Sequence, residues 1–183
     1  SQLSTKIDSV ETSVLSNITT IKLKKDYTAT IDGTASSISL TFGNALYNPH
    51  SGHNAAGGGI LTTTGFFVSG DASTEYFFDD DGEGNIRRYS LSGSTRVYKD
   101  NTAGTIIYST GKVSINSLTF TSTSGTASTI EFTVTPSSND VISARNQLLD
   151  ITANEISVTG VADTVASGET SAGVGYTTTS SYS

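Results

Sequence analysis

The densest group of chemically capable side chains is an acidic run, Asp79-Asp80-Asp81-Gly82-Glu83-Gly84-Asn85. Carboxylates this close together can ligate Ca²⁺ or share a proton. The run departs from the calcium-loop pattern D-x-[DN]-x-[DN]-G, because Phe77 stands at the position of the first Asp. We therefore predict that Asp79, Asp80 and Asp81 lie in the solvated tip of a hairpin. Calcium binding and paired-carboxylate hydrolysis are the alternatives.

Two histidines, His50 and His53, lie three residues apart in the segment Asn48-Pro49-His50-Ser51-Gly52-His53. This spacing could place two imidazoles on one metal ion if a third ligand came from elsewhere. Because Pro49 and Gly52 favour a turn over a helix face, we predict an ordinary loop with two exposed histidines. A metal site is the alternative.

The remaining motifs point to no catalytic machinery. The triplet Gly57-Gly58-Gly59 lacks the strand, the helix and the Lys-Ser/Thr pair of a phosphate-binding loop, so it predicts flexibility. The abundant serines include no nucleophile-elbow pattern G-x-S-x-G. We therefore predict no catalytic residue, no metal ligand and no cofactor, and we expect that the protein is not an enzyme.

Six aromatic residues occupy predicted strand positions and could form a sugar-stacking platform on an open sheet. Rings at such positions more often pack in a core or along a sheet surface, which is the interpretation we prefer. The residues are Tyr76, Phe77, Phe78, Tyr89, Tyr98 and Tyr108.

Composition narrows the classes of protein and partner. The chain has 183 residues and a net charge of -7, so its overall field repels phosphate and nucleic acid is not an expected partner. It has no Cys, which excludes disulfides and thiolate-bound metals. No run is long and apolar enough to span a membrane, and no membrane partner is expected. High Ser and Thr content with 34% hydrophobic residues predicts thin β layers.

The first twenty residues have a helical period, with apolar residues three or four positions apart. We predict an amphipathic helix over 1–20, which packs either on its own domain or against another subunit. The candidate interface consists of Leu3, Ile7, Val10, Val14 and Ile18. Because the chain lacks an initiator Met, we expect a processed product or a fragment in which this helix is truncated.

Residues 21–162 are predicted to form a β-rich domain, because short alternating or apolar runs recur about every ten residues between turn signals. We expect strands at 21–32 and 37–42 to pair as a hairpin around Asp32-Gly33, and a long loop at 44–59. A second hairpin turns at Gly70-Asp71. The predicted strands after residue 59 are 60–69, 74–78, 86–91, 95–99, 105–108, 112–120 and 129–135.

Two later segments differ from this β pattern. Capping side chains after Pro136 predict a short helix at 139–149. A last strand is expected at Glu155–Val161, and residues 163–183 form a polar tail or arm. The predicted fold class is α+β, mostly β, with antiparallel sheets in a sandwich-like or curled arrangement.

Several segments together resemble a known family. These are Tyr76-Phe77-Phe78-Asp79-Asp80-Asp81-Gly82, Asn85-Ile86-Arg87-Arg88-Tyr89, Ala103-Gly104-Thr105-Ile106-Ile107-Tyr108-Ser109-Thr110-Gly111-Lys112-Val113, Phe132-Thr133-Val134-Thr135-Pro136-Ser137-Ser138-Asn139-Asp140-Val141 and Arg145-Asn146-Gln147-Leu148-Leu149-Asp150-Ile151. In this order they resemble the C-terminal part of the T4-like bacteriophage baseplate wedge protein that forms a ring of dimers around the tail hub.

The resemblance implies a structural component of the virion that is assembled in the host cytoplasm. It implies a homodimer that contacts other baseplate wedge proteins, with no catalytic residue to carry over. The alternative function is a β-sandwich module of a phage tail or secreted adhesin that binds glycans or a receptor through Tyr and Phe side chains.

Overall fold

The structure is a computed structural model that describes residues 20–48 and 59–138, all within the unit Ser1–Gln147. Several predictions therefore lie outside the described residues: the candidate interface on the N-terminal helix (Leu3, Ile7, Val10, Val14, Ile18), the histidines His50 and His53, the short helix at 139–149, the strand Glu155–Val161 and the tail 163–183.

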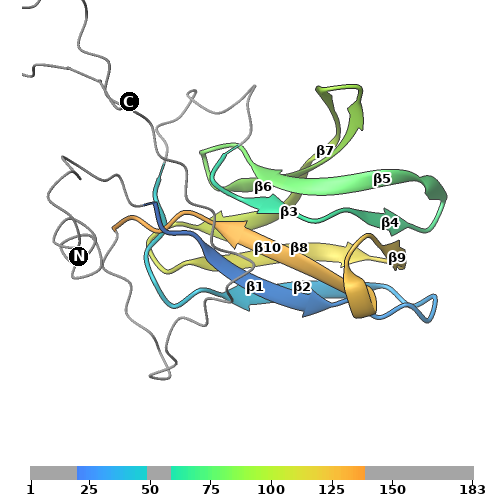
Figure 1. The fold of residues 1–183 in the computed structure, drawn as a ribbon, viewed down its shortest axis with the longest axis horizontal. Helices are drawn as coiled ribbons and strands as arrows, with labels where there is room; N and C mark the ends of the chain where they lie inside the picture. Colours follow the sequence, from blue (N-terminus) through green and yellow to red (C-terminus); the bar gives the residue numbers. More distant parts are fainter. Residues whose placement is uncertain (1–19, 49–58, 139–183) are drawn as a thin grey trace, which may run out of the picture. The chain divides into compact units, whose positions relative to one another are not determined.

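The described chain forms two antiparallel sheets that face each other (Figure 1). The smaller sheet has the order β1 (Leu23–Thr28), β10 (Thr129–Val134) and β3 (Thr62–Thr63). The larger has the order β2 (Ser36–Thr41), β8 (Lys112–Leu118), β7 (Thr95–Ile107), β6 (Asn85–Ser92), β5 (Asp71–Asp80), β4 (Phe66–Val68) and β9 (Phe120–Thr123). The predicted mostly β, antiparallel architecture is confirmed.

Side-chain alternation places the core between the two sheets. In β10, Ile130, Phe132 and Val134 are fully buried, and the residues between them are only partly buried. The ring of Phe132 stacks on Phe78 of the larger sheet with 6.3 Å between centroids, and Phe78 in turn stacks on Phe66. Burial of each large apolar side chain contributes about 1.5–3 kcal/mol, so this shared core holds the two sheets together.

The predicted hairpin around Asp32-Gly33 is wrong. β1 pairs with β10 in the smaller sheet, whereas β2 pairs with β8 in the larger one. Gly33 does turn the chain, with φ 83°, and Asp32 accepts a hydrogen bond from the Thr34 amide. The turn lies within a connection that crosses from one sheet to the other. Each strand must bury one face against the core, and an isolated two-stranded hairpin cannot provide that burial.

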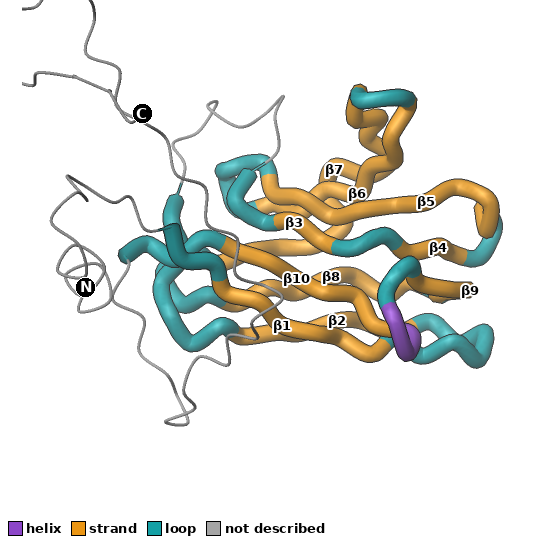
Figure 2. Tube along the Cα trace, viewed as in Figure 1, coloured by secondary structure: helices purple, strands orange, loops and turns teal. Residues whose placement is uncertain are grey.

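Two predicted hairpins are confirmed. β4 and β5 pair around Gly70, and β5 and β6 pair across the acidic turn that contains Gly82 and Gly84 (Figure 2). All three glycines have positive φ. The predicted strands at 95–99 and 105–108 form a single strand, β7, because bulges let it keep pairing with β6 through the polar segment between them.

The predicted strands at 60–69 and 112–120 are each divided. Between β3 and β4 the chain leaves the smaller sheet for the larger at Gly65, and β8 gives way to β9 at Thr119. Such corners lie where strands change sheets or partners. In the described part of the chain the only helical segment is the 3-10 turn Thr126–Ser128, and no helix there is long and apolar enough to cross a membrane.

Candidate functional site

Asp79 and Asp80 do not lie in a solvated tip as predicted. Asp79 and Asp80 are the last two residues of β5, paired with Arg87 and Ile86 of β6, and neither side chain has any exposed surface. Only the segment beginning at Asp81 forms the turn. Because successive side chains in a strand point to opposite faces, the two buried carboxylates lie on opposite faces of β5 and have different neighbours.

Asp80 lies on the face of β5 that points into the core, where Tyr76 and Phe78 also lie. Its Oδ1 accepts a hydrogen bond from the backbone N–H of Leu61 at 2.8 Å, and its Oδ2 accepts one from the hydroxyl of Tyr108 at 2.6 Å. Burial raises the pKa of Tyr108, and the hydrogen bond to Asp80 and the charge of its carboxylate raise it further. Asp80 thus joins the entry to β3 with the end of β7.

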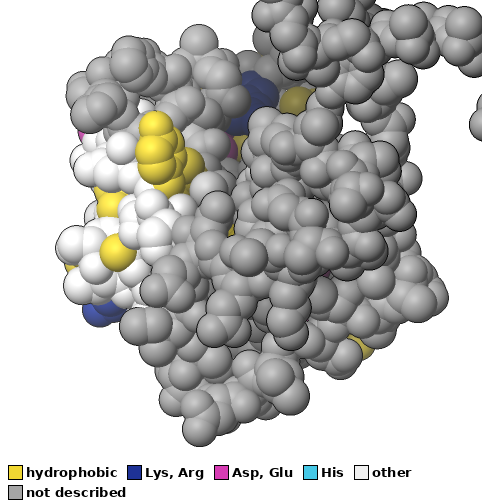
Figure 3. Space-filling view, turned by 60° about the vertical axis from the view of Figure 1, so that its left-hand side comes forward, with side chains coloured by type: hydrophobic (Ala, Val, Ile, Leu, Met, Phe, Trp, Pro, Cys, Tyr) yellow, Lys and Arg dark blue, Asp and Glu magenta, His cyan; other side chains and the backbone are white. Residues whose placement is uncertain are grey.

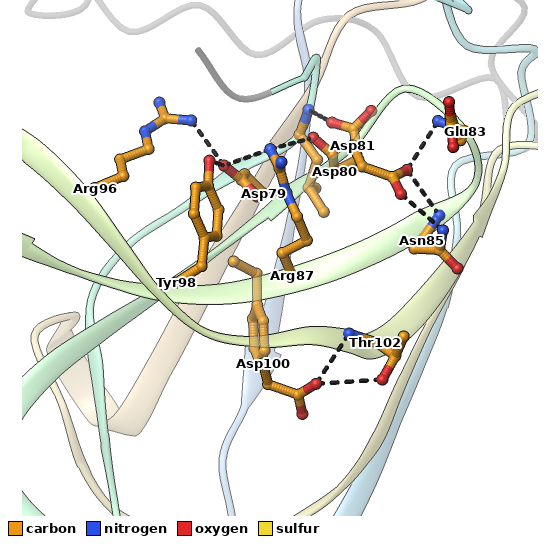
Figure 4. A network of polar contacts seen from close by, with 12 residues as sticks. Asp79, Asp80, Asp81, Glu83, Asn85, Arg87, Arg96, Tyr98, Asp100 and Thr102 are labelled. Atoms are coloured by element: carbon orange, nitrogen blue, oxygen red, sulfur yellow. Dashed lines mark hydrogen bonds and ion pairs between the residues drawn. The ribbon is translucent and has the colours of Figure 1, made fainter. Parts of the chain in front are cut away.

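Asp79 lies on the opposite, outer face of the sheet, where three side chains donate hydrogen bonds to it (Figure 4). Arg87 donates through Nε to Oδ1 at 2.9 Å and through Nη2 to Oδ2 at 3.2 Å. Arg96 Nη1 and the Tyr98 hydroxyl donate to Oδ2 at 2.7 and 2.9 Å. Arg87 also donates to the carbonyl of Asp80 at 3.1 Å. The carboxylate is therefore bound on both oxygens by groups from β6 and β7.

The electrostatics follow from this burial. Loss of hydration raises the pKa of Asp79, while the hydrogen bonds from Arg87 and Tyr98 and the two guanidinium charges act in the opposite direction. Burial also raises the pKa of Tyr98, and the hydrogen bond that Tyr98 donates to Asp79 adds to this shift. Two cations surround one carboxylate, so the cluster carries an excess positive charge if all three groups are ionised.

Aromatic rings complete this outer cluster. The guanidinium of Arg87 lies 4.2 Å from the ring centroid of Tyr98, and that of Arg96 lies 4.8 Å from that of Tyr89. Tyr89 is stacked on Phe77 and tilted against Tyr98, with centroid separations of 5.6 and 5.7 Å. These cation–π and ring contacts fix the orientation of both arginines.

Asp81 organises the tip itself. Its Oδ1 accepts hydrogen bonds from the backbone N–H groups of Glu83 and Asn85 at 2.8 and 3.0 Å, and its Oδ2 accepts one from Asn85 Nδ2 at 2.7 Å. Gly82 and Gly84 have positive φ, which the tight turn requires. Asp81 therefore has a turn-forming role.

The tip should loosen in acid. Partial burial acts to raise the pKa of Asp81, but the hydrogen bonds from Asn85 and Glu83 outweigh it, so the folded pKa lies below the ordinary value of 3.8. Its stabilising contribution is present above pH 3.8 and is lost as the pH falls through the lower folded pKa. The protection factors of the Glu83 and Asn85 amides, the ratios of intrinsic to observed exchange rate, should fall from about pH 5 to about pH 2, and Asp81→Asn should remove that dependence. Identical pH profiles in both proteins would contradict this role.

The geometry of Asp79 and Asp80 argues against calcium binding and against paired-carboxylate hydrolysis by these two residues. Both require two carboxylates directed at one point, whereas Asp79 and Asp80 point to opposite faces and are occupied by donors. Within residues 20–48 and 59–138, no group of three or more His, Cys, Asp or Glu side chains is placed to hold a metal ion.

Sequence reasoning missed the partners Arg87, Arg96 and Tyr98. One signal was available: with the turn centred on Glu83, Asp79 and Arg87 are equidistant from it and must face each other if both strands extend that far. Among the predicted aromatic residues, Tyr76 and Phe78 lie in the core, and Phe77, Tyr89 and Tyr98 lie on the outer face.

Comparison with known proteins adds no relationship: no family model, no curated protein and no solved structure matches the chain.

Proposed function

We propose that the protein is a structural component of a bacteriophage tail baseplate wedge, which acts by holding copies of itself and neighbouring wedge proteins in place in the virion. The observation that carries this proposal is that the buried carboxylates of the acidic run hold strands together. Its two buried carboxylates are bound by donors from β6 and β7, from Leu61 just before β3 and from Tyr108 just after β7, which supports a bracing role over a reaction centre.

The resemblance to the wedge protein supports the same function. The segments that carry it in the described chain include the second half of β5, most of β6, the end of β7 and the start of β8, which are neighbours in the larger sheet. The Asp79 network joins β5 with β6 and β7, and the Asp80 network joins β5 with Tyr108, which follows β7. The resemblance and the internal bracing thus fall on one part of the fold.

Exposed apolar side chains support contacts with neighbouring proteins. Large hydrophobic residues that are 40–51% exposed occur on several elements, and Figure 3 shows hydrophobic side chains among polar and backbone atoms on one face. Apolar side chains that enter a contact between subunits are removed from water, which stabilises the contact. The residues are Ile31, Tyr47, Leu91, Val97 and Ile107.

The test uses the full chain and the phage that encodes it. Sedimentation equilibrium over a range of protein concentrations should show a concentration-dependent dimer. Antibodies against the chain should label the baseplate end of phage tails in electron micrographs. A monomer at every concentration, with no label on the tails, would contradict the proposal.

A second function, glycan or receptor binding, is favoured by the partly exposed rings of Phe77 and Tyr98 beside Arg96 on the outer face. If sugars stack there, Tyr98→Ala should abolish binding on a glycan array. Tyr98→Phe should retain it, because Phe keeps the ring and loses only the hydroxyl that contacts Asp79. Absence of binding by the unmodified protein, or equal binding by all three proteins, would rule out this stacking site.

A further inference from the structure

One long strand of the larger sheet has a neighbour along only part of one side. β6 pairs with β7 from Thr95 to Thr105, but β8 pairs only with Gly104–Ile107. In an antiparallel strand, every second residue directs its N–H and C=O away from a single neighbour. Among the described residues, the open side of Thr95–Thr102 receives one hydrogen bond from another strand, from Asn116 Nδ2 to the Thr102 carbonyl at 2.9 Å.

This open edge lies on a projecting hairpin. Figure 2 shows the turn between β6 and β7 standing clear of the other described elements. Leu91 and Val97, near that turn, are 51% and 40% exposed. The stretch Thr95–Thr102 contains no Pro, the residue that most directly blocks pairing at sheet edges. The edge thus presents backbone groups and apolar surface together.

The charge of this hairpin is opposite to that of the rest of the chain. Residues 85–102 contain four cations, Arg87, Arg88, Arg96 and Lys99, against Asp100 and the neighbouring Asp79, a net charge of +2. The other parts of the chain carry six cations and 15 carboxylates, a net charge of -9.

Two of these cations lie at the open edge. Lys99 is exposed and is the extra residue of a bulge, and Arg96 is held in orientation by Asp79 and Tyr89. The stretch Thr95–Thr102 also contains Asp100, so its own net charge is +1, and the larger positive charge belongs to the hairpin as a whole. Two such positively charged hairpins would repel each other, which argues against a second copy as the occupant, whereas an acidic strand is complementary.

We propose that Thr95–Thr102 is a docking edge at which an extended, acidic strand of a partner protein adds to the larger sheet. The partner strand donates to and accepts from the outward backbone groups of β7, and its carboxylates face Arg96 and Lys99. Strand addition of this kind takes its affinity from main-chain hydrogen bonds and its specificity from side chains. The docking edge is independent of the baseplate proposal.

The probe is a synthetic peptide of alternating Val and Glu, titrated into the full, isotope-labelled chain and followed by amide chemical shifts. Shifts should be confined to Thr95–Thr102 and the residues paired with it. The same peptide with N-methyl groups on the residues that face β7 should not bind, because its donors are removed. A peptide of alternating Val and Lys should bind at least about tenfold more weakly.

Matched charge reversals provide the control. Lys99→Glu should weaken binding of the Val-Glu peptide about tenfold, whereas Lys112→Glu, an equal change of charge on β8, should alter it less than about twofold. Three results would overturn the proposal: no binding, equal binding by the N-methylated peptide, or equal effects of the two reversals. Concentration-dependent shifts at Thr95–Thr102 without peptide would also overturn it, since a second copy would then occupy the edge.

Discussion

Replacing Asp79 with alanine is expected to lower the free energy of unfolding by about 3–5 kcal/mol. The substitution removes the acceptor of Arg87, which is almost fully buried, and of Arg96 and Tyr98. A buried cation that loses its counter-charge costs far more than the pair contributes while intact, because its hydration has already been lost. Urea-unfolding curves followed by circular dichroism measure the change.

The control for this prediction is Asp26→Ala, the same substitution at an exposed position of β1. It should change the free energy of unfolding by no more than about 0.5 kcal/mol. If Asp79→Ala were as mild as this control, the buried network would not brace the sheet.

Gly104→Ala is expected to destabilise the protein by about 3 kcal/mol, because the new methyl group has no space. A Cβ at Gly104 would overlap the carbonyl oxygen of Ser114 and press on the Cα of Ile115. Both are backbone atoms of β8, so relief requires that β7 and β8 move apart where they pair. Unfolding curves and amide exchange of the β7–β8 ladder measure the effect.

Gly33→Ala separates this crowding from the ordinary cost of replacing glycine. Nothing lies within 4 Å of a Cβ built at Gly33, and its φ of 83° alone makes the substitution unfavourable. The expected cost is about 1–2 kcal/mol. Gly104→Ala at or below that value, with an unchanged ladder, would show that β8 lies farther from Gly104 than the structure places it.

The strands that sequence patterns predicted best are those whose alternation matches one buried face. In β10, every second residue is apolar and every one of those is buried, so a period of two was sufficient. The hairpins around Gly70 and across the acidic turn could be predicted equally well, because a turn signal and two adjacent runs define such a pairing locally.

Local sequence patterns could not predict which strands pair when the partners are far apart in sequence. The alternation of 21–32 and 37–42 predicted strands at both places. Their partners are β10, roughly 105 residues after β1, and β8, roughly 75 residues after β2. Local turn chemistry at Asp32-Gly33 cannot reveal which sheet each strand joins. Only the shared core decides that.

The prediction for the buried residues Asp79 and Asp80 was wrong for a related reason. Charge density placed Asp79 and Asp80 at a solvated tip, because carboxylates are almost never fully buried unless paired. Among the groups that bind them, Arg96 and Tyr98 come from β7, Tyr108 directly follows β7, and the Leu61 amide directly precedes β3. Their proximity depends on the curvature and register of the sheet, which local composition does not encode.

A double-mutant cycle between Asp79 and Arg87 tests most directly whether the acidic run braces the fold. Asp79→Ala, Arg87→Ala and the double variant are compared by urea unfolding. We expect a coupling energy of about 1.5–3 kcal/mol, with the double variant much less destabilised than the sum of the two single variants. Additive effects would contradict it, because they would mean that the two buried charges do not stabilise each other.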